Sequence, residues 1–297
     1  MKIDVDDRTF WRLAAACVAV LVPLNWSWYE WGRQLPGSHA LYLIAGTAVY
    51  FVLLRWIAGI RFTDLSRAAR FVVVSSIALL IVFLGFGRSN TFYRVFAPLM
   101  PEGAPTPLVA FAYFAACSVA LRFAVPYLLV RFKLREPARD YGYVVRGGTA
   151  MRWAYFGLFV VMVPLVLWAS TLPDFQSSYP QTKGLIQGNE VSLRLFLLYH
   201  AAYFMVFASG ESFWRGYMTF GLGRDLDVAA LPRMVMMYSI GHYEKPILEV
   251  NASIIAGFVL GYLALRHRSF FLGALLHWSI ALTMDLAVLW QRGLTWN

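Results

Sequence analysis

The chain has little charge for its length. Only 14% of its 297 residues are Asp, Glu, Lys or Arg, whereas soluble domains average about 25%. In addition, 60% of the residues are hydrophobic and 17% are aromatic. Together these values exclude an ordinary water-soluble domain. The apolar residues come in runs of about 20, the length that crosses the hydrocarbon core of a bilayer. The composition therefore predicts a polytopic membrane protein.

Cysteine and acidic residues are also scarce. The two cysteines, Cys17 and Cys117, fall inside apolar runs, so no disulfide framework is expected. There are 16 acidic residues against 26 Lys and Arg, which gives a net charge of +10. The basic residues lie between the apolar runs rather than in one patch. This distribution indicates membrane topology and contact with anionic lipid, and it argues against a nucleic-acid partner.

The predicted fold is all-α, a polytopic transmembrane bundle of about 8–9 helices. The expected spans are residues 13–28, 40–56, 71–86, 107–130, 153–172, 193–222, 228–242, 250–265 and 270–290. The sequence favours nine transmembrane helices, and the number falls to eight if one early span is a surface helix. The sixth span is long enough to tilt or break near Ser209 and Gly210. Counts of Lys and Arg in alternate loops place the N-terminus in the cytoplasm and the C-terminus outside.

Ionisable residues interrupt three of the last apolar segments. Glu211 and Arg215 stand four residues apart, on one face of a helix. His242 and His277 follow in two later segments. An ionisable group at membrane depth costs at least about 2.5 kcal/mol and usually faces a bundle interior or a wet cavity. These residues are therefore candidates for a functional site.

The chemistry of these groups suits hydrolysis. Glu211 and His242 can together deprotonate a water, and His277 can donate a hydrogen bond to a developing oxyanion. These are the groups needed to cleave a peptide bond inside a membrane. The same three residues could also bind zinc, with water as the fourth ligand. They lack the His-Glu-x-x-His spacing that makes a zinc site specific, so we expect no cofactor and keep zinc as the less favoured alternative.

The order of these motifs resembles a known family. Glu-x-x-x-Arg-Gly at 211–216, aromatic-x-x-x-His at 238–242 and His-x-x-x-Ala at 277–281 follow one another. The pattern resembles the CAAX-prenyl-protease and bacteriocin-processing (CPBP or ABI) family of intramembrane glutamic proteases. The resemblance covers about residues 193–289, and the basic segment 131–143 looks like the stretch that often precedes the family's core. It implies a protease-like core in the last four helices, within residues 151–297, preceded by N-terminal transmembrane helices and a basic cytoplasmic loop in residues 1–150.

The chain departs from the family pattern at two positions. The family usually has two adjacent Glu residues, and here Gly210 occupies the first, which is generally assigned as catalytic. The third motif normally ends in Asn or Asp, and here Ala281 stands there, with Asp285 one turn further on. Lys245 and Glu249 follow His242 in a Lys-Pro-x-x-Glu pattern similar to a bacterial branch of the family that lacks the first Glu. Glu249 is thus either a relocated catalytic carboxylate or a charge at a helix start.

The first hypothesis is an intramembrane endopeptidase. Glu211 with His242 would activate the water, His277 would stabilise the oxyanion, and Arg215 and Asp285 would orient the site. Asp285 is otherwise a surface residue near the end of its span. By resemblance, the substrate is a membrane-associated protein or peptide cut at a C-terminal sorting signal, a CAAX-type tail or a leader. The expected location is a bacterial inner membrane.

Two other classes of function compete with this hypothesis. Gly210 and Ala281 favour a catalytically inactive member that binds a membrane partner as a scaffold or immunity protein. A small-solute transporter is weaker, because no internal repeat pairs interrupted helices across two halves of the sequence. The stripe of Ser253, Gly257 and Gly261 predicts only close packing of one helix on a neighbour.

Overall fold

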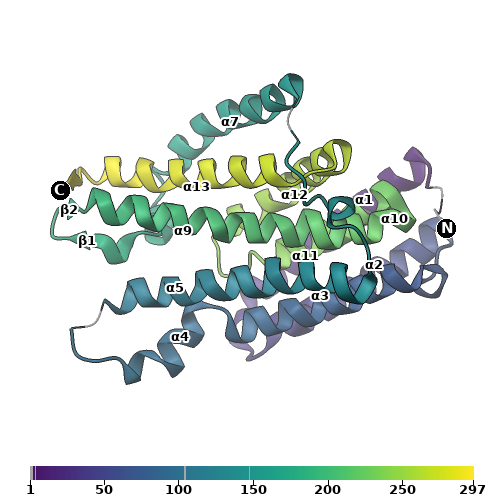
Figure 1. The fold of residues 1–297 in the computed structure, drawn as a ribbon, viewed down its shortest axis with the longest axis horizontal. Coiled ribbons are helices and arrows are strands. Elements are labelled where there is room, and N and C mark those ends of the chain that lie inside the picture. Colours follow the sequence, from purple (N-terminus) through teal and green to yellow (C-terminus); the bar gives the residue numbers. More distant parts are fainter. Residues whose placement is uncertain (1–2, 4, 104, 147) are drawn as a thin grey trace. The chain divides into compact units, whose positions relative to one another are not determined.

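The protein is an all-α polytopic membrane protein. The computed structural model, which describes residues 3, 5–103, 105–146 and 148–297, is 80% helical (Figure 1). Within these residues, eight helical stretches are long and apolar enough to cross a membrane. The predicted class, an integral multi-pass helical bundle, is therefore confirmed. The chain divides into two compact units, which are described separately below.

The helices follow the predicted apolar segments closely. They are α1 (Asp7–Glu30), α2 (Ser38–Ala58), α3 (Arg67–Phe86), α4 (Ser89–Val95), α5 (Thr106–Val119), α6 (Val125–Leu128), α7 (Thr149–Ala169), α8 (Pro173–Ser178), α9 (Leu193–Glu211), α10 (Gly221–Leu226), α11 (Ala230–Ile240), α12 (Ile247–His267) and α13 (Phe271–Gln291). Three π-helical segments continue these helices: η4 (Ala120–Ala124), η5 (Leu129–Leu134) and η8 (Ser212–Phe220). The connection between α3 and α5 contains the short helix α4.

The seventh predicted span is the main difference. Helix α11 has 11 residues, all of them buried. At 1.5 Å per residue it is about 16 Å long, roughly half of the 30 Å hydrocarbon core. It belongs to one continuous membrane-crossing candidate, Leu193–Ile240. The number of candidates is therefore eight because α11 shares one candidate stretch with α9, while α1, α2 and α3 each count as one.

Unit 1 combines the chain up to Gly85 with Ala124–Val144 and Ser212–Phe270. Helix α11 lies at its centre and packs against α1, α2, α12 and η8. A Cβ atom on Gly261 of α12 would lie 2.7 Å from Cδ2 of Leu231 on α11. The small-residue stripe is thus a close helix–helix contact, as predicted.

Unit 2 combines Phe86–Phe123, Val145–Glu211 and Phe271–Asn297. Helices α9 and α13 run side by side (Figure 1), with α5 against α9 and α7 against α13. A small sheet pairs β1 (Ile186–Gln187) antiparallel with β2 (Glu190–Val191), and β2 parallel with β3 (Thr295–Trp296). Both units use residues from either side of position 150, and the functional division at that position stays a prediction.

Candidate functional site

The first and third motifs meet in unit 2. The strand pairing of β2 with β3 sets the start of α9 beside the end of α13, so the two helices are antiparallel. The last residue of α9, Glu211, therefore lies opposite the first turns of α13. Nδ1 of His277 is 3.1 Å from Oε1 of Glu211. The Glu211 side chain is 1% exposed and that of His277 is 26% exposed, so a buried carboxylate holds an imidazole that remains accessible.

Neighbouring residues fix both members of this pair. Gly273 lies one turn before His277, and a Cβ atom there would lie 3.1 Å from Oε2 of Glu211. The missing side chain at Gly273 thus makes room for the carboxylate. From α9, the ring of Phe207 packs on His277 with 4.5 Å between the ring centroids. Sequence analysis missed Gly273, although its spacing of four residues from His277 was a signal.

The contact determines what the imidazole can do. With Glu211 ionised, Nδ1 of His277 donates to the carboxylate, and Nε2 of the neutral ring carries the lone pair. That nitrogen can accept a proton from water. A carboxylate that orients an imidazole in this way is the arrangement found in acid–base hydrolytic sites. The sequence interpretation paired Glu211 with His242. The contact seen within unit 2 is with His277.

The second motif organises a separate cluster in unit 1. The guanidinium carbon of the fully buried Arg215 lies 4.3 Å from the centroid of the Tyr238 ring, a cation–π contact. The ring of His242 packs edge-to-face on the same tyrosine at 4.3 Å. Nδ1 of His242 also donates to the backbone oxygen of Tyr238 at 2.7 Å. One aromatic residue therefore positions both the cation and the imidazole, and Nε2 of neutral His242 carries the lone pair.

The glycine of the first motif has a packing role in unit 1. A Cβ atom on Gly216 would lie 3.1 Å from the backbone oxygen of Tyr141. The hydroxyl of Tyr141 donates to Oε2 of Glu136 at 2.6 Å, and burial raises the pKa of Tyr141 well above its usual value. The segment expected to precede the core thus packs directly on the motif segment.

The motif segment itself has unusual backbone geometry. Its helix does not break near Ser209 and Gly210, as the sequence interpretation allowed. It changes to π-helical winding at Ser212 and continues so to Phe220. All nine residues of this segment are buried. Long π-helical segments are rare, and π-helical turns occur often at functional sites.

The remaining predicted carboxylates have other contacts. Glu249 lies in the first turn of α12, 3.9 Å from Nζ of Lys245. This is compatible with both interpretations of Glu249. Asp285 is fully buried, which excludes a surface position. It lies eight residues beyond His277, about 12 Å further along α13.

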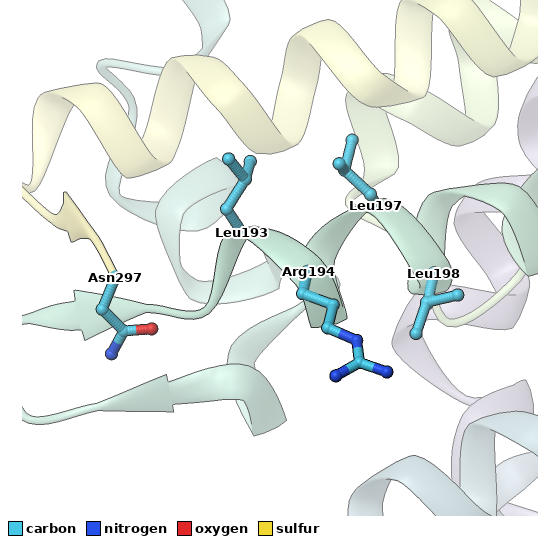
Figure 2. Close-up of a pocket in the computed structure, with 5 residues that line it drawn as sticks. All are labelled: Leu193, Arg194, Leu197, Leu198 and Asn297. Carbon is cyan, nitrogen blue, oxygen red and sulfur yellow. The ribbon is translucent and has the colours of Figure 1, made fainter.

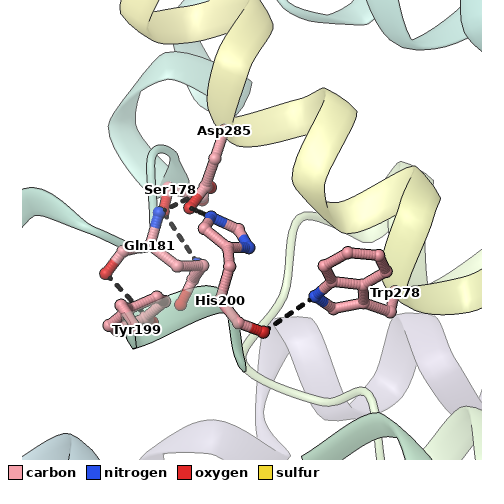
Figure 3. Close-up of polar contacts among 6 residues, drawn as sticks. All are labelled: Ser178, Gln181, Tyr199, His200, Trp278 and Asp285. Carbon is pink, nitrogen blue, oxygen red and sulfur yellow. Dashed lines mark hydrogen bonds and ion pairs between the residues drawn. The ribbon is translucent and has the colours of Figure 1, made fainter. Parts of the chain in front are cut away.

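Asp285 takes part in a second acid–imidazole pair, shown in Figure 3. Its Oδ2 atom is 3.5 Å from Nε2 of His200 on α9, and its Oδ1 accepts the backbone N–H of Gln181 at 2.8 Å. Nε1 of Trp278 donates to the backbone oxygen of His200 at 2.9 Å. No sequence motif surrounds His200. The pair joins α9, α13 and the segment between α7 and α9.

Arg122, for which the sequence offers no account, supports α9. Its Nη2 atom donates to the backbone oxygen of Val206 at 3.2 Å and to Oγ of Ser209 at 3.3 Å. These contacts lie within unit 2, close before Glu211. The arginine therefore helps to fix the end of α9 that carries the carboxylate.

The described residues contain no candidate metal site, and the comparisons with known proteins identify no relative. Among the residues that the structure describes, no group of three or more His, Cys, Asp or Glu side chains could hold a metal ion, so the zinc alternative gains no support. Comparison with protein-family models, with curated proteins and with solved structures finds no match. The resemblance to the CPBP family therefore rests on the three motifs alone.

Proposed function

We propose that this protein is an intramembrane endopeptidase. The observation that carries the proposal is the 3.1 Å contact between the buried carboxylate of Glu211 and the imidazole of His277. Ionisable groups inside a membrane are energetically costly. A buried acid–imidazole pair between two membrane helices is therefore a candidate for a functional site. Its geometry suits activation of water, which is the first requirement of peptide hydrolysis.

The proposed reaction uses His277 as the general base. Its Nε2 takes a proton from water while Glu211 stabilises the imidazolium that forms. The resulting hydroxide attacks the peptide carbonyl and gives a tetrahedral oxyanion. The same imidazolium then returns its proton to the leaving amine, so the catalyst is restored. The motif resemblance, and not their measured position, makes Arg215 and His242 the candidates for stabilising the oxyanion.

The proposed substrate is a membrane-associated protein or peptide, cut at a C-terminal sorting signal, a CAAX-type tail or a leader. This proposal comes from the motif resemblance, as does the location in a bacterial inner membrane. The cytoplasmic N-terminus is proposed from the distribution of Lys and Arg between loops.

Comparison of protein termini tests the proposal without a candidate substrate in hand. Membranes from cells that produce the wild type or Glu211→Gln at equal abundance would be analysed by mass spectrometry of N- and C-terminal peptides. We expect one or a few processed termini that require the wild-type protein. Identical sets of termini in both samples would contradict the endopeptidase.

A catalytically inactive scaffold or immunity protein is the second candidate. It is favoured by Gly210 and Ala281, buried positions at which the family carries functional side chains. A scaffold would retain a specific membrane partner in the Glu211→Gln variant, and the termini of that partner would not change. Chemical crosslinking followed by mass spectrometry, done on both samples, distinguishes the two candidates.

A further inference from the structure

An open groove lies at the start of α9 in unit 2. Its volume is about 610 Å³, and it is lined by Leu193, Arg194, Leu197, Leu198 and Asn297 (Figure 2). The three leucines are 46–60% exposed. Figure 2 shows Leu193 and Leu197 projecting from one side of the helix and Arg194 and Leu198 from the other. The groove is thus apolar, with one cation at its edge.

The position of the groove matches the level of lipid headgroups. Leu193 is the first residue of the membrane-crossing candidate Leu193–Ile240. Trp296 on the adjoining strand is 45% exposed and packs on Phe196 at 5.0 Å, and exposed tryptophans are typical of the membrane interface. Leu198 lies four residues beyond Arg194, which is about 6 Å deeper along the helix.

Two opposite charges flank the groove. Arg194 is exposed, and in the part of the chain that the structure describes its guanidinium makes no hydrogen bond or ion pair. It can therefore bind a phosphate through two parallel N–H donors. Oε2 of Glu190 accepts a hydrogen bond from Nδ2 of Asn297 at 2.9 Å. Because Asn297 lines the groove, this contact holds a carboxylate beside it.

We propose that the groove binds phosphatidylethanolamine. The phosphate pairs with Arg194, the primary ammonium pairs with Glu190, and an acyl chain lies along Leu198, on the same side of the helix as Arg194 (Figure 2). The three N–H donors of the ammonium can hydrogen-bond to the carboxylate. The quaternary ammonium of phosphatidylcholine has no such donor, and phosphatidylglycerol has no cation to offset Glu190. The charge pair therefore selects the ethanolamine headgroup.

Lipid titration of the purified full chain in detergent tests this site. Native mass spectrometry would follow binding of phosphatidylethanolamine, phosphatidylcholine and phosphatidylglycerol with identical acyl chains. The proteins are the wild type, Arg194→Gln, Glu190→Gln and the control Arg33→Gln, which changes an exposed arginine of unit 1. All three substitutions are at exposed positions, so the fold should be retained.

We expect the wild type and Arg33→Gln to prefer phosphatidylethanolamine. Arg194→Gln should weaken its binding about tenfold, because a charge-assisted phosphate contact is lost. Glu190→Gln should remove the preference over the other two lipids. Equal binding by Arg194→Gln and Arg33→Gln would overturn the site. A preference for phosphatidylglycerol that Glu190→Gln leaves unchanged would overturn the ethanolamine assignment.

Discussion

Nδ1 of His277 lies 3.1 Å from Oε1 of Glu211, across two antiparallel membrane helices. This contact joins the first predicted motif to the third. In the proposed reaction the carboxylate can act without a second glutamate at Gly210, because it orients an imidazole that serves as the base.

Removing either member of this pair should abolish processing. Glu211→Gln and His277→Gln should each lower the cleavage rate at least about 100-fold, the usual minimum contribution of a general acid–base group. The double variant should be no slower than either single one, because residues that act as a unit are not additive. Rates would be measured on a substrate identified from its altered terminus, at matched membrane abundance. Glu249→Gln is the control and should retain activity. Loss of activity in Glu249→Gln alone would show that the catalytic carboxylate is Glu249.

A methyl group at Gly273 should disturb the carboxylate without unfolding the protein. The added Cβ atom of Gly273→Ala would lie 3.1 Å from Oε2 of Glu211, so the carboxylate must move by a few tenths of an ångström. We expect slower cleavage with nearly unchanged thermal unfolding. Gly157→Ala in α7 is the matched control, since nothing lies within 4 Å of its added Cβ atom. Equal cleavage by the two variants would mean that the position of Glu211 is not critical.

The ring of Tyr238 should be required for cleavage. Arg215 and His242 both pack on this ring, and the backbone oxygen that binds His242 remains in any variant. Tyr238→Phe should therefore keep more of the cleavage activity than Tyr238→Leu, because phenylalanine retains the ring. Circular dichroism and thermal unfolding would verify that both variants fold. If Tyr238→Leu is as active as Tyr238→Phe, the cluster has no part in the reaction.

The pair of His200 and Asp285 should stabilise the segment between α7 and α9. A buried polar group that loses its partner costs about 1–3 kcal/mol, and Asp285→Asn also weakens the contact with Gln181. We expect a lower unfolding temperature and faster tryptic cleavage after the exposed Lys183. Asp174→Asn changes an exposed acid of the same segment and should behave as the wild type. Normal stability combined with lost processing in Asp285→Asn would instead assign Asp285 to the reaction.

The sequence was sufficient to predict most of the fold. Runs of apolar residues located eight membrane helices, because the bilayer demands a nearly fixed length of apolar chain. Length alone could not separate α11 from a true span. All of its residues are buried and most are apolar, and burial in protein favours the same residue types as burial in lipid.

The sequence was less informative about the site. Motif order located Glu211 and His277, but it could not predict which histidine the carboxylate contacts, since that depends on how α9 and α13 are aligned. The pair of His200 and Asp285 stayed hidden for the same reason. Its members are 85 positions apart, and only the antiparallel packing of two helices brings them together.

The most direct test is the cleavage rate of one identified substrate peptide by purified protein in liposomes. The wild type should release a product with the terminus found in cells, and Glu211→Gln should release it at least about 100-fold more slowly. Equal rates for the two proteins, or no cleavage by the wild type, would contradict the proposal that Glu211 and His277 activate water for peptide hydrolysis.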